Sequence, residues 1–66
     1  MEVNVKLIES MRKERGYTMD KMAQLLNYKV RGTYSNKVNG YRNFTLKDLF
    51  VISMIFDIEL TDLITK

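Results

Sequence analysis

Cysteine, histidine and proline are all missing from this sequence of 66 residues, which also has only three glycines. The lack of cysteine excludes disulfides, thiol nucleophiles and thiolate metal ligands, and the lack of histidine removes the commonest general base and zinc ligand. The carboxylates are scattered and form no paired-acid pattern. We therefore expect neither an enzyme nor a metal or cofactor site, and no small-molecule ligand is evident.

Long apolar runs are missing as well, because no stretch approaches the roughly 18 residues that a membrane-spanning helix needs. The N-terminus also lacks the basic start and apolar middle of a signal peptide. Together with the absence of cysteine, these features predict a cytoplasmic protein with no membrane partner. A chain of this length without linkers or repeats predicts one domain, residues 1–66, with a small core.

Apolar residues recur at helical spacing along most of the chain, which predicts an all-α protein. The predicted helices cover residues 5–15, about 18–26, 31–38 and 45–56, and a brief fifth helix follows near residues 60–64. Capping or terminating residues flank these segments: Asn4, Gly16, Thr18, Asn27, Asn39, Gly40, Thr45 and Thr61. The predicted inward face of the fourth helix comprises Leu46, Leu49, Phe50, Ile52, Ser53 and Phe56.

Charge is unevenly distributed along the chain. Residues 29–47 carry five basic side chains and no acid, whereas residues 1–28 are nearly neutral and residues 48–66 carry four acids against Lys66. Basic side chains interspersed with Thr, Asn, Ser and Tyr are typical of a surface that contacts phosphates and base edges. A solvated helix and turn that lack acids would have the same composition, so charge alone leaves both interpretations open.

Two helices joined by a short turn, followed by a polar and basic helix, form a helix-turn-helix pattern. The informative stretches are MRKERGYT at residues 11–18, Met22-Ala23 with Leu26, and TYSNKVNG at residues 33–40. In this order and spacing, residues 7–63 resemble the phage Cro/repressor-type helix-turn-helix domain, which is also called lambda-repressor-like or XRE-type. The resemblance implies a compact five-helix fold and a transcription regulator, such as a phage or prophage repressor, that binds double-stranded DNA inside a bacterial host.

Three positions depart from the pattern of that family. The chain between the second helix and Gly40 is one residue longer than usual, which leaves the start of the helix at 31–38 open. Met19 stands where the family usually has a phosphate-contacting Gln, and Val38 stands where the family often has Glu. In some members that Glu pairs with the arginine of the first helix, so Arg12 either finds another partner or faces solvent.

The resemblance implies that the helix at residues 31–38 is the recognition helix and lies in the major groove of an operator half-site. Arg31 is expected to donate two hydrogen bonds to a guanine, and Asn36 is expected to read an adenine. The predicted base contacts are Arg31, Gly32, Thr33 and Asn36. The predicted phosphate contacts, which fix the register on the duplex, are Thr18, Lys29, Ser35, Lys37, Tyr41, Arg42 and Asn43.

The fourth helix has more apolar residues than one buried face requires. Val51, Met54 and Ile55 are left over, with Ile58 at the following turn, and the family often has polar residues at the first two positions. Isolated surface hydrophobes are normal, but several on one helix indicate a protein contact. We therefore predict a weak homodimer through Val51, Met54, Ile55 and Ile58. The alternative is a protein-binding regulator, antitoxin-like or antirepressor-like, that uses the same surface.

Overall fold

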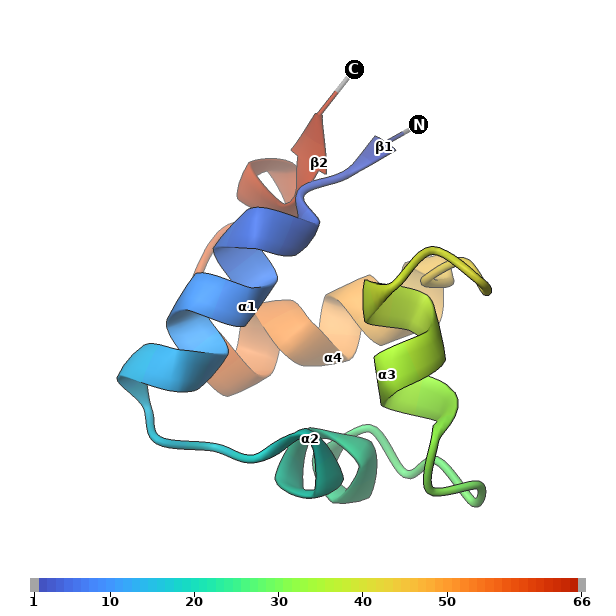
Figure 1. Ribbon diagram of the computed structural model, residues 1–66. Helices are drawn as coiled ribbons and strands as arrows, with labels where there is room; N and C mark the ends of the chain where they lie inside the picture. Colours follow the sequence, from blue (N-terminus) through green and yellow to red (C-terminus); the bar gives the residue numbers. More distant parts are fainter. Residues whose placement is uncertain (1, 66) are drawn as a thin grey trace.

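The computed structural model describes residues 2–65 and contains four α-helices. The elements are β1 (Glu2–Val3), α1 (Val5–Glu14), α2 (Met19–Leu25), α3 (Thr33–Val38), α4 (Leu46–Phe56), the 3-10 turn η1 (Leu60–Leu63) and β2 (Ile64–Thr65). In Figure 1, α1 and α3 lie on opposite sides of α4, α2 lies below them, and the paired strands β1 and β2 lie at the top. Within residues 2–65, no helix is long and apolar enough to span a membrane.

The helix starts follow the predicted capping residues. Asn4 and Thr18 accept hydrogen bonds from the backbone amides of Leu7 and Lys21 through their side-chain oxygens. Thr45 and Asp48 form a reciprocal capping box at the start of α4, in which each side chain accepts from the other residue's backbone amide. These bonds satisfy amides that have no partner within their own helix, which explains why the three starts are visible in the sequence.

Several helix ends are marked by left-handed backbone, also as predicted. Gly16, Asn27 and Gly40 have φ angles of 72°, 60° and 85°. Glycine and asparagine adopt this conformation more readily than other residues, so they end helices and begin turns. Asp57 at φ 55° ends α4 in the same way and was not predicted.

The predicted fifth helix is wrong. Residues 60–63 form a single 3-10 turn, and Glu59, not Thr61, precedes it without a side-chain capping bond. The chain then extends as β2, which pairs antiparallel with β1 through Glu2↔Thr65 and Val3↔Ile64. The backbone amide of Asn4 donates to the carbonyl of Leu63 at 2.7 Å and anchors this pairing. Pairing with a distant strand thus takes over the backbone groups that a longer helix would have used.

The helix predicted at residues 31–38 begins two residues later, at Thr33. α3 starts at Thr33, with Gly32 as an N-cap that has no side chain to offer, and Arg31 lies in the turn before it. The amide of Thr33 bonds back to the carbonyl of Val30. The turn between α2 and α3 therefore contains residues that the sequence pattern assigned to the helix.

The core lies between the four helices and is organised around Tyr34, whose side chain is fully buried. The rings of Tyr34 and Phe44 pack in a T-shaped arrangement, with their centroids 6.1 Å apart. The buried apolar residues are Ile8, Met22, Ala23, Leu26, Tyr34, Phe44, Leu49, Ile52, Phe56 and Leu63.

The inward face of α4 is rotated about the helix axis relative to the predicted face. Leu49, Ile52 and Phe56 are buried, but Leu46 and Phe50 are 51% and 52% exposed. Val51 and Ile55, which were predicted to be surplus, are half-buried and pack against the core, as does Ile58. The buried side of α4 was mispredicted because the helix is apolar on most sides. Its pattern of apolar residues therefore does not show which side faces the core.

Arg12 has partners within its own part of the chain. Its guanidinium donates two hydrogen bonds to Glu9, at 2.8 Å and 3.0 Å, and a third to the carbonyl of Tyr17. The hydroxyl of Tyr34 donates to the same Glu9 carboxylate at 2.7 Å. Burial opposes ionisation of Glu9, but these hydrogen bonds outweigh it and hold its pKa below the usual value. The cluster joins α1 to the inner face of α3 without needing an acid at Val38.

Candidate nucleic-acid interface

α2 and α3 are adjacent helices, and backbone hydrogen bonds shape the turn between them. The amides of Asn27 and Tyr28 donate to the carbonyls of Gln24 and Ala23, which turns the chain sharply at the end of α2. α3 then places Tyr34 in the core while Asn36 is exposed to solvent. Since α3 makes little more than one and a half turns, its buried and exposed sides are fixed by these few residues.

The predicted base-contacting residues are at the exposed start of α3. Arg31, Gly32 and Asn36 are exposed, and Thr33 is half-buried at the first helical position. They come from the last part of the turn and the first part of the helix, which is the region that enters the major groove in helix-turn-helix docking. The structure therefore leaves three of these four residues exposed on the turn and on α3, although Arg31 is outside the helix itself.

Arg31 is held by a residue that was not predicted to belong to the site. Its Nε donates to Asp20 Oδ1 at 3.3 Å and its Nη2 donates to Asp20 Oδ2 at 2.9 Å. Asp20 is in the first turn of α2, so this two-bond pair links the starts of the two helices across the turn. The sequence gives little sign of this pair, because an acid in the first turn of a helix also interacts favourably with the helix dipole.

The loop after α3 is fixed to α3 by its backbone. The amides of Tyr41 and Arg42 both donate to the carbonyl of Asn36, at 2.9 Å and 3.3 Å. Tyr41, Arg42 and Asn43 are exposed there, as is Lys29 in the turn before α3. Tyr41 and Arg42, which are both predicted to contact phosphates, thus have their backbone fixed relative to Asn36.

Two further predicted phosphate contacts already use their hydroxyls within the protein. Thr18 Oγ1 is the N-cap acceptor of α2, and Ser35 Oγ accepts from Asn39 Nδ2 at 3.3 Å. Each hydroxyl keeps a hydrogen that can be donated to an oxygen. Thr18 is exposed, whereas Ser35 is half-buried.

Lys37 was predicted to contact a phosphate, and the structure places it elsewhere. Its side chain is only 9% exposed and forms an ion pair with Asp48, which is also buried. The ammonium also lies 4.6 Å from the centre of the Tyr28 ring. Lys37 points inward because it neutralises the carboxylate that caps α4, and in this position it cannot serve a DNA phosphate.

The environment of Asp48 explains why a charge is tolerated there. Burial opposes its ionisation, but hydrogen bonds from Lys37 and from the backbone amide of Thr45 outweigh burial and hold the pKa of Asp48 below the usual value. Tyr28 lies beside this pair, and burial raises the pKa of its hydroxyl. The hydroxyl oxygen of Tyr28 is buried and has no hydrogen-bond partner among residues 2–65.

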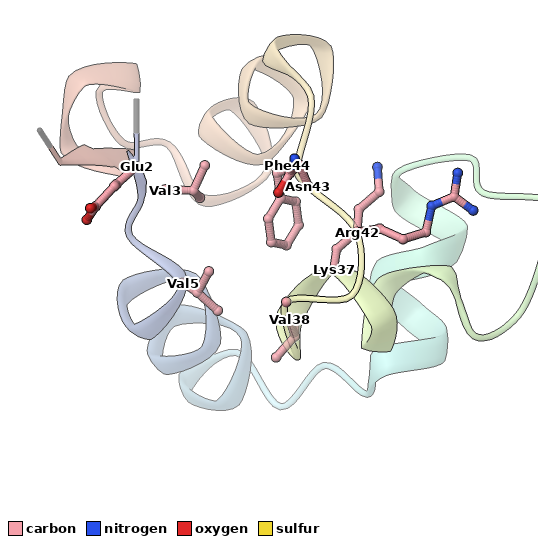
Figure 2. Close-up of a pocket in the computed structure, with 9 residues that line it drawn as sticks. Glu2, Val3, Val5, Lys37, Val38, Arg42, Asn43 and Phe44 are labelled. Atoms are coloured by element: carbon pink, nitrogen blue, oxygen red, sulfur yellow. The ribbon is translucent and has the colours of Figure 1, made fainter.

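An open cleft of about 530 Å³ lies between β1, the start of α1 and the loop after α3. Figure 2 shows Val3, Val5, Val38 and Phe44 around it, while the guanidinium of Arg42 points away from these apolar side chains. The charge of Arg42 is therefore directed away from the apolar part of the cleft. Within residues 2–65, no cluster of acidic side chains could hold a metal ion.

Comparison with known protein families matches residues 8–63 to the helix-turn-helix family. This match covers most of the sequence, and it coincides with the helices whose geometry is described above. The chain belongs to this family. Comparison with curated proteins and with solved structures finds no match.

Membership of the helix-turn-helix family implies binding to double-stranded DNA and a role in transcription regulation. The family match also supports the predicted all-α helix-turn-helix fold. Residues 2–65 contain four α-helices, whereas five were predicted. In this helix-turn-helix protein, the exposed surface made by the start of α3 and the loop after it is the candidate DNA interface. The family match itself assigns no individual residue to base or phosphate contact.

Proposed function

We propose that the protein is a sequence-specific transcription regulator of phage Cro/repressor type, with α3 in the major groove of an operator half-site. The observation that carries the proposal is the arrangement of Asn36. Its side chain is exposed on α3, while its carbonyl accepts the amides of Tyr41 and Arg42. One short helix thus presents a polar reader and holds a basic loop at a fixed distance from it.

In the proposed complex, the residues that contact bases and the residues that contact phosphates have separate roles. Asn36 pairs with an adenine edge, Arg31 with a guanine edge, and Thr33 contacts a thymine methyl group or a phosphate. Lys29, Tyr41, Arg42 and Asn43 contact phosphates and set the register of α3 without reading sequence. The exposed backbone amides at the starts of α2 and α4 add further phosphate contacts.

The experiment that tests this function is selection of bound fragments from a random duplex pool with the purified protein alone. We expect enrichment of a palindromic sequence, with half-sites about one helical turn apart if the protein binds as a symmetric dimer. Enrichment of a single sequence without symmetry would keep DNA reading but reject the dimer. No enrichment over the starting pool would contradict the proposed function.

We further propose that two copies pair through an apolar stripe on α4, formed by Leu46, Phe50 and Met54. These residues are spaced by four, so they share one side of the helix, and they are 51%, 52% and 73% exposed. Exposed Lys47 and Asp57 lie near opposite ends of the same stripe. Antiparallel packing of two α4 helices about a two-fold axis would place Lys47 of each copy against Asp57 of the other.

This surface replaces the one predicted from the sequence, and the two surfaces respond differently to mutation. Phe50→Lys with Met54→Lys should leave the fold intact and give only monomer in sedimentation, because both side chains are exposed. Cooperative binding to a two-half-site operator should be lost in the same variant. Val51→Lys is the matched control, because Val51 packs against the core and its replacement should lower thermal stability.

A contact stripe this small implies a weak dimer that DNA tightens. The proposed pairing is wrong if the double variant still sediments as a dimer, or if the wild-type protein binds a lone half-site as tightly as a full operator. The same stripe also favours the second candidate function, a protein-binding regulator that resembles an antitoxin or antirepressor. In that case the purified protein would leave duplex DNA unshifted.

A further inference from the structure

The pair between Asp20 and Arg31 is an unusual feature of the candidate DNA interface. It is largely open to solvent, since the side chain of Arg31 is 86% exposed and that of Asp20 is 53% exposed. An exposed ion pair contributes little to folding, so stability does not account for it. Its position does suggest a role, because it joins the first turn of α2 to the residue before Gly32, the N-cap of α3.

The hydrogen bonds use one side of the guanidinium and leave the other free. Arginine has five N–H donors, and Asp20 takes the one on Nε and one of the two on Nη2. Both hydrogens on Nη1 and the second hydrogen on Nη2 remain available. The Nη1 and Nη2 edge can therefore donate two parallel hydrogen bonds to guanine O6 and N7 while Asp20 keeps its own two bonds.

We propose that Asp20 is a positioning residue that orients Arg31 for a guanine and so sets the sequence preference at one base pair. This inference rests on the proposed DNA-reading function. A free arginine in a turn has many rotamers and can also swing to a phosphate, where it contributes affinity but no discrimination. Asp20 fixes the plane of the guanidinium before DNA arrives, so that little conformational freedom is lost when the base contact forms.

The same carboxylate has an opposite effect on non-specific binding. Asp20 is a negative charge at the edge of a surface that approaches phosphates, so it weakens sequence-independent attraction to DNA. Removal of Asp20 should therefore lower preference for guanine at one position and raise affinity for random DNA. Loss of a residue with a purely structural role would change the affinity for the operator and the affinity for random DNA in the same direction.

The test uses the full chain and duplexes that carry the selected operator with each base pair of the half-site varied in turn. For Asp20→Ala we expect the guanine preference at one position to fall about tenfold, with the other positions unchanged. Affinity for random duplex should rise about twofold at low salt. Asp20→Asn should be intermediate, because its one amide oxygen replaces part of the two-bond pair.

Controls separate this effect from loss of structure and from loss of the arginine. Thermal unfolding of Asp20→Ala should match that of Asp62→Ala, an exposed aspartate in η1 whose removal changes the net charge equally. Arg31→Lys should lose the preference at the same base pair as Asp20→Ala, since lysine lacks the planar two-donor edge. The double variant should then be no less selective than Arg31→Lys alone.

Two results would overturn the inference and leave the proposed function intact. In the first, Arg31→Lys loses a guanine preference that Asp20→Ala keeps. In the second, Asp20→Ala strengthens binding to the selected operator, which would show that Asp20 competes with the base for Arg31. If the wild-type protein selects no sequence from the random pool, the proposed function and this inference fail together.

Discussion

At the scale of single residues, Lys37 and Asp48 form a buried ion pair. It joins α3 to the start of α4, and both side chains are about nine-tenths buried. Asp48 also accepts the backbone amide of Thr45, so one carboxylate caps α4 and neutralises a lysine. Because a buried charge without its partner is costly, neither residue can be removed alone without destabilising the fold.

We predict that Lys37→Met lowers the free energy of unfolding by about 3–5 kcal/mol, since it leaves the Asp48 carboxylate buried and uncompensated. Urea denaturation measures this loss. The double variant Lys37→Met with Asp48→Leu should recover part of the stability, although the cap at Thr45 is lost with it. Unchanged stability of Lys37→Met would mean that Lys37 is free in solution and available to a phosphate.

The acid side of the stability profile should depend on Asp48 and Glu9. Both carboxyls have a pKa below the usual value in the folded protein, so folding favours their ionised forms. Their contribution is complete above the unfolded values near pH 4 and is lost as pH falls through the lower folded values. Stability should therefore be flat at neutral pH and fall steeply below about pH 4.

Asp48→Asn tests the contribution of one of these two groups. The variant should be less stable than the wild-type protein at pH 7, and its stability should decline less as the solution is acidified. Chemical denaturation at a series of pH values between neutral and strongly acidic measures both effects. Parallel curves for the two proteins would show that Asp48 is not responsible for the acid transition.

At the scale of elements, α3 and the loop after it form one unit, because two backbone amides of the loop donate to the carbonyl of Asn36. A side-chain change at Asn36 leaves those backbone bonds in place. Its effect on DNA binding therefore reports on the base contact alone, whereas a change in the loop reports on phosphate contact. The short length of α3 makes this separation possible, since few of its residues are both exposed and polar.

We predict that Asn36→Ala costs about 1–3 kcal/mol on the selected operator and little on random duplex DNA. Arg42→Ala should weaken both complexes about equally, because a phosphate contact carries no sequence information. Parallel titrations of each variant with the two duplexes give the comparison. If Asn36→Ala keeps the preference of the wild-type protein, a different face of α3 reads the bases.

At the scale of the whole molecule, folding changes how much of the basic segment 29–47 can act on DNA. The segment has five cations in the sequence, and the structure buries one of them, Lys37. Among residues 2–65, Lys29, Arg42 and Lys47 make no ion pair, and Arg31 shares its charge with Asp20. The surface presented to a duplex is therefore less positive than the sequence indicates.

Salt dependence measures the number of effective cations directly. With about four phosphates neutralised per subunit, the logarithm of the binding constant should fall against the logarithm of salt concentration with a slope of roughly −3 to −4. Arg42→Ala should reduce the magnitude of this slope by about one. A flat dependence would be incompatible with a phosphate-binding role for the segment.

Much of this protein can be read from its sequence, because the signals involved are local. Asn4, Thr18 and the Thr45–Asp48 capping box bond to backbone within three residues, and Asn27 and Gly40 favour left-handed backbone wherever they occur. The helix-turn-helix assignment follows from the same local order of helices, and the family match confirms that part of the resemblance. The exposed position of Asn36 also follows from its spacing relative to Tyr34, which lies two residues earlier on the same helix.

Only the tertiary structure determines the contacts between residues that are distant in the chain. Lys37 is buried because Asp48 comes close to it when α3 packs on α4, and Arg31 is held because Asp20 faces it across the turn. Residues 64–65 form a strand because β1 lies beside them. A charged side chain has the same local signature whether it faces a phosphate or a buried carboxylate. Its partner is selected by packing, and packing depends on the whole chain.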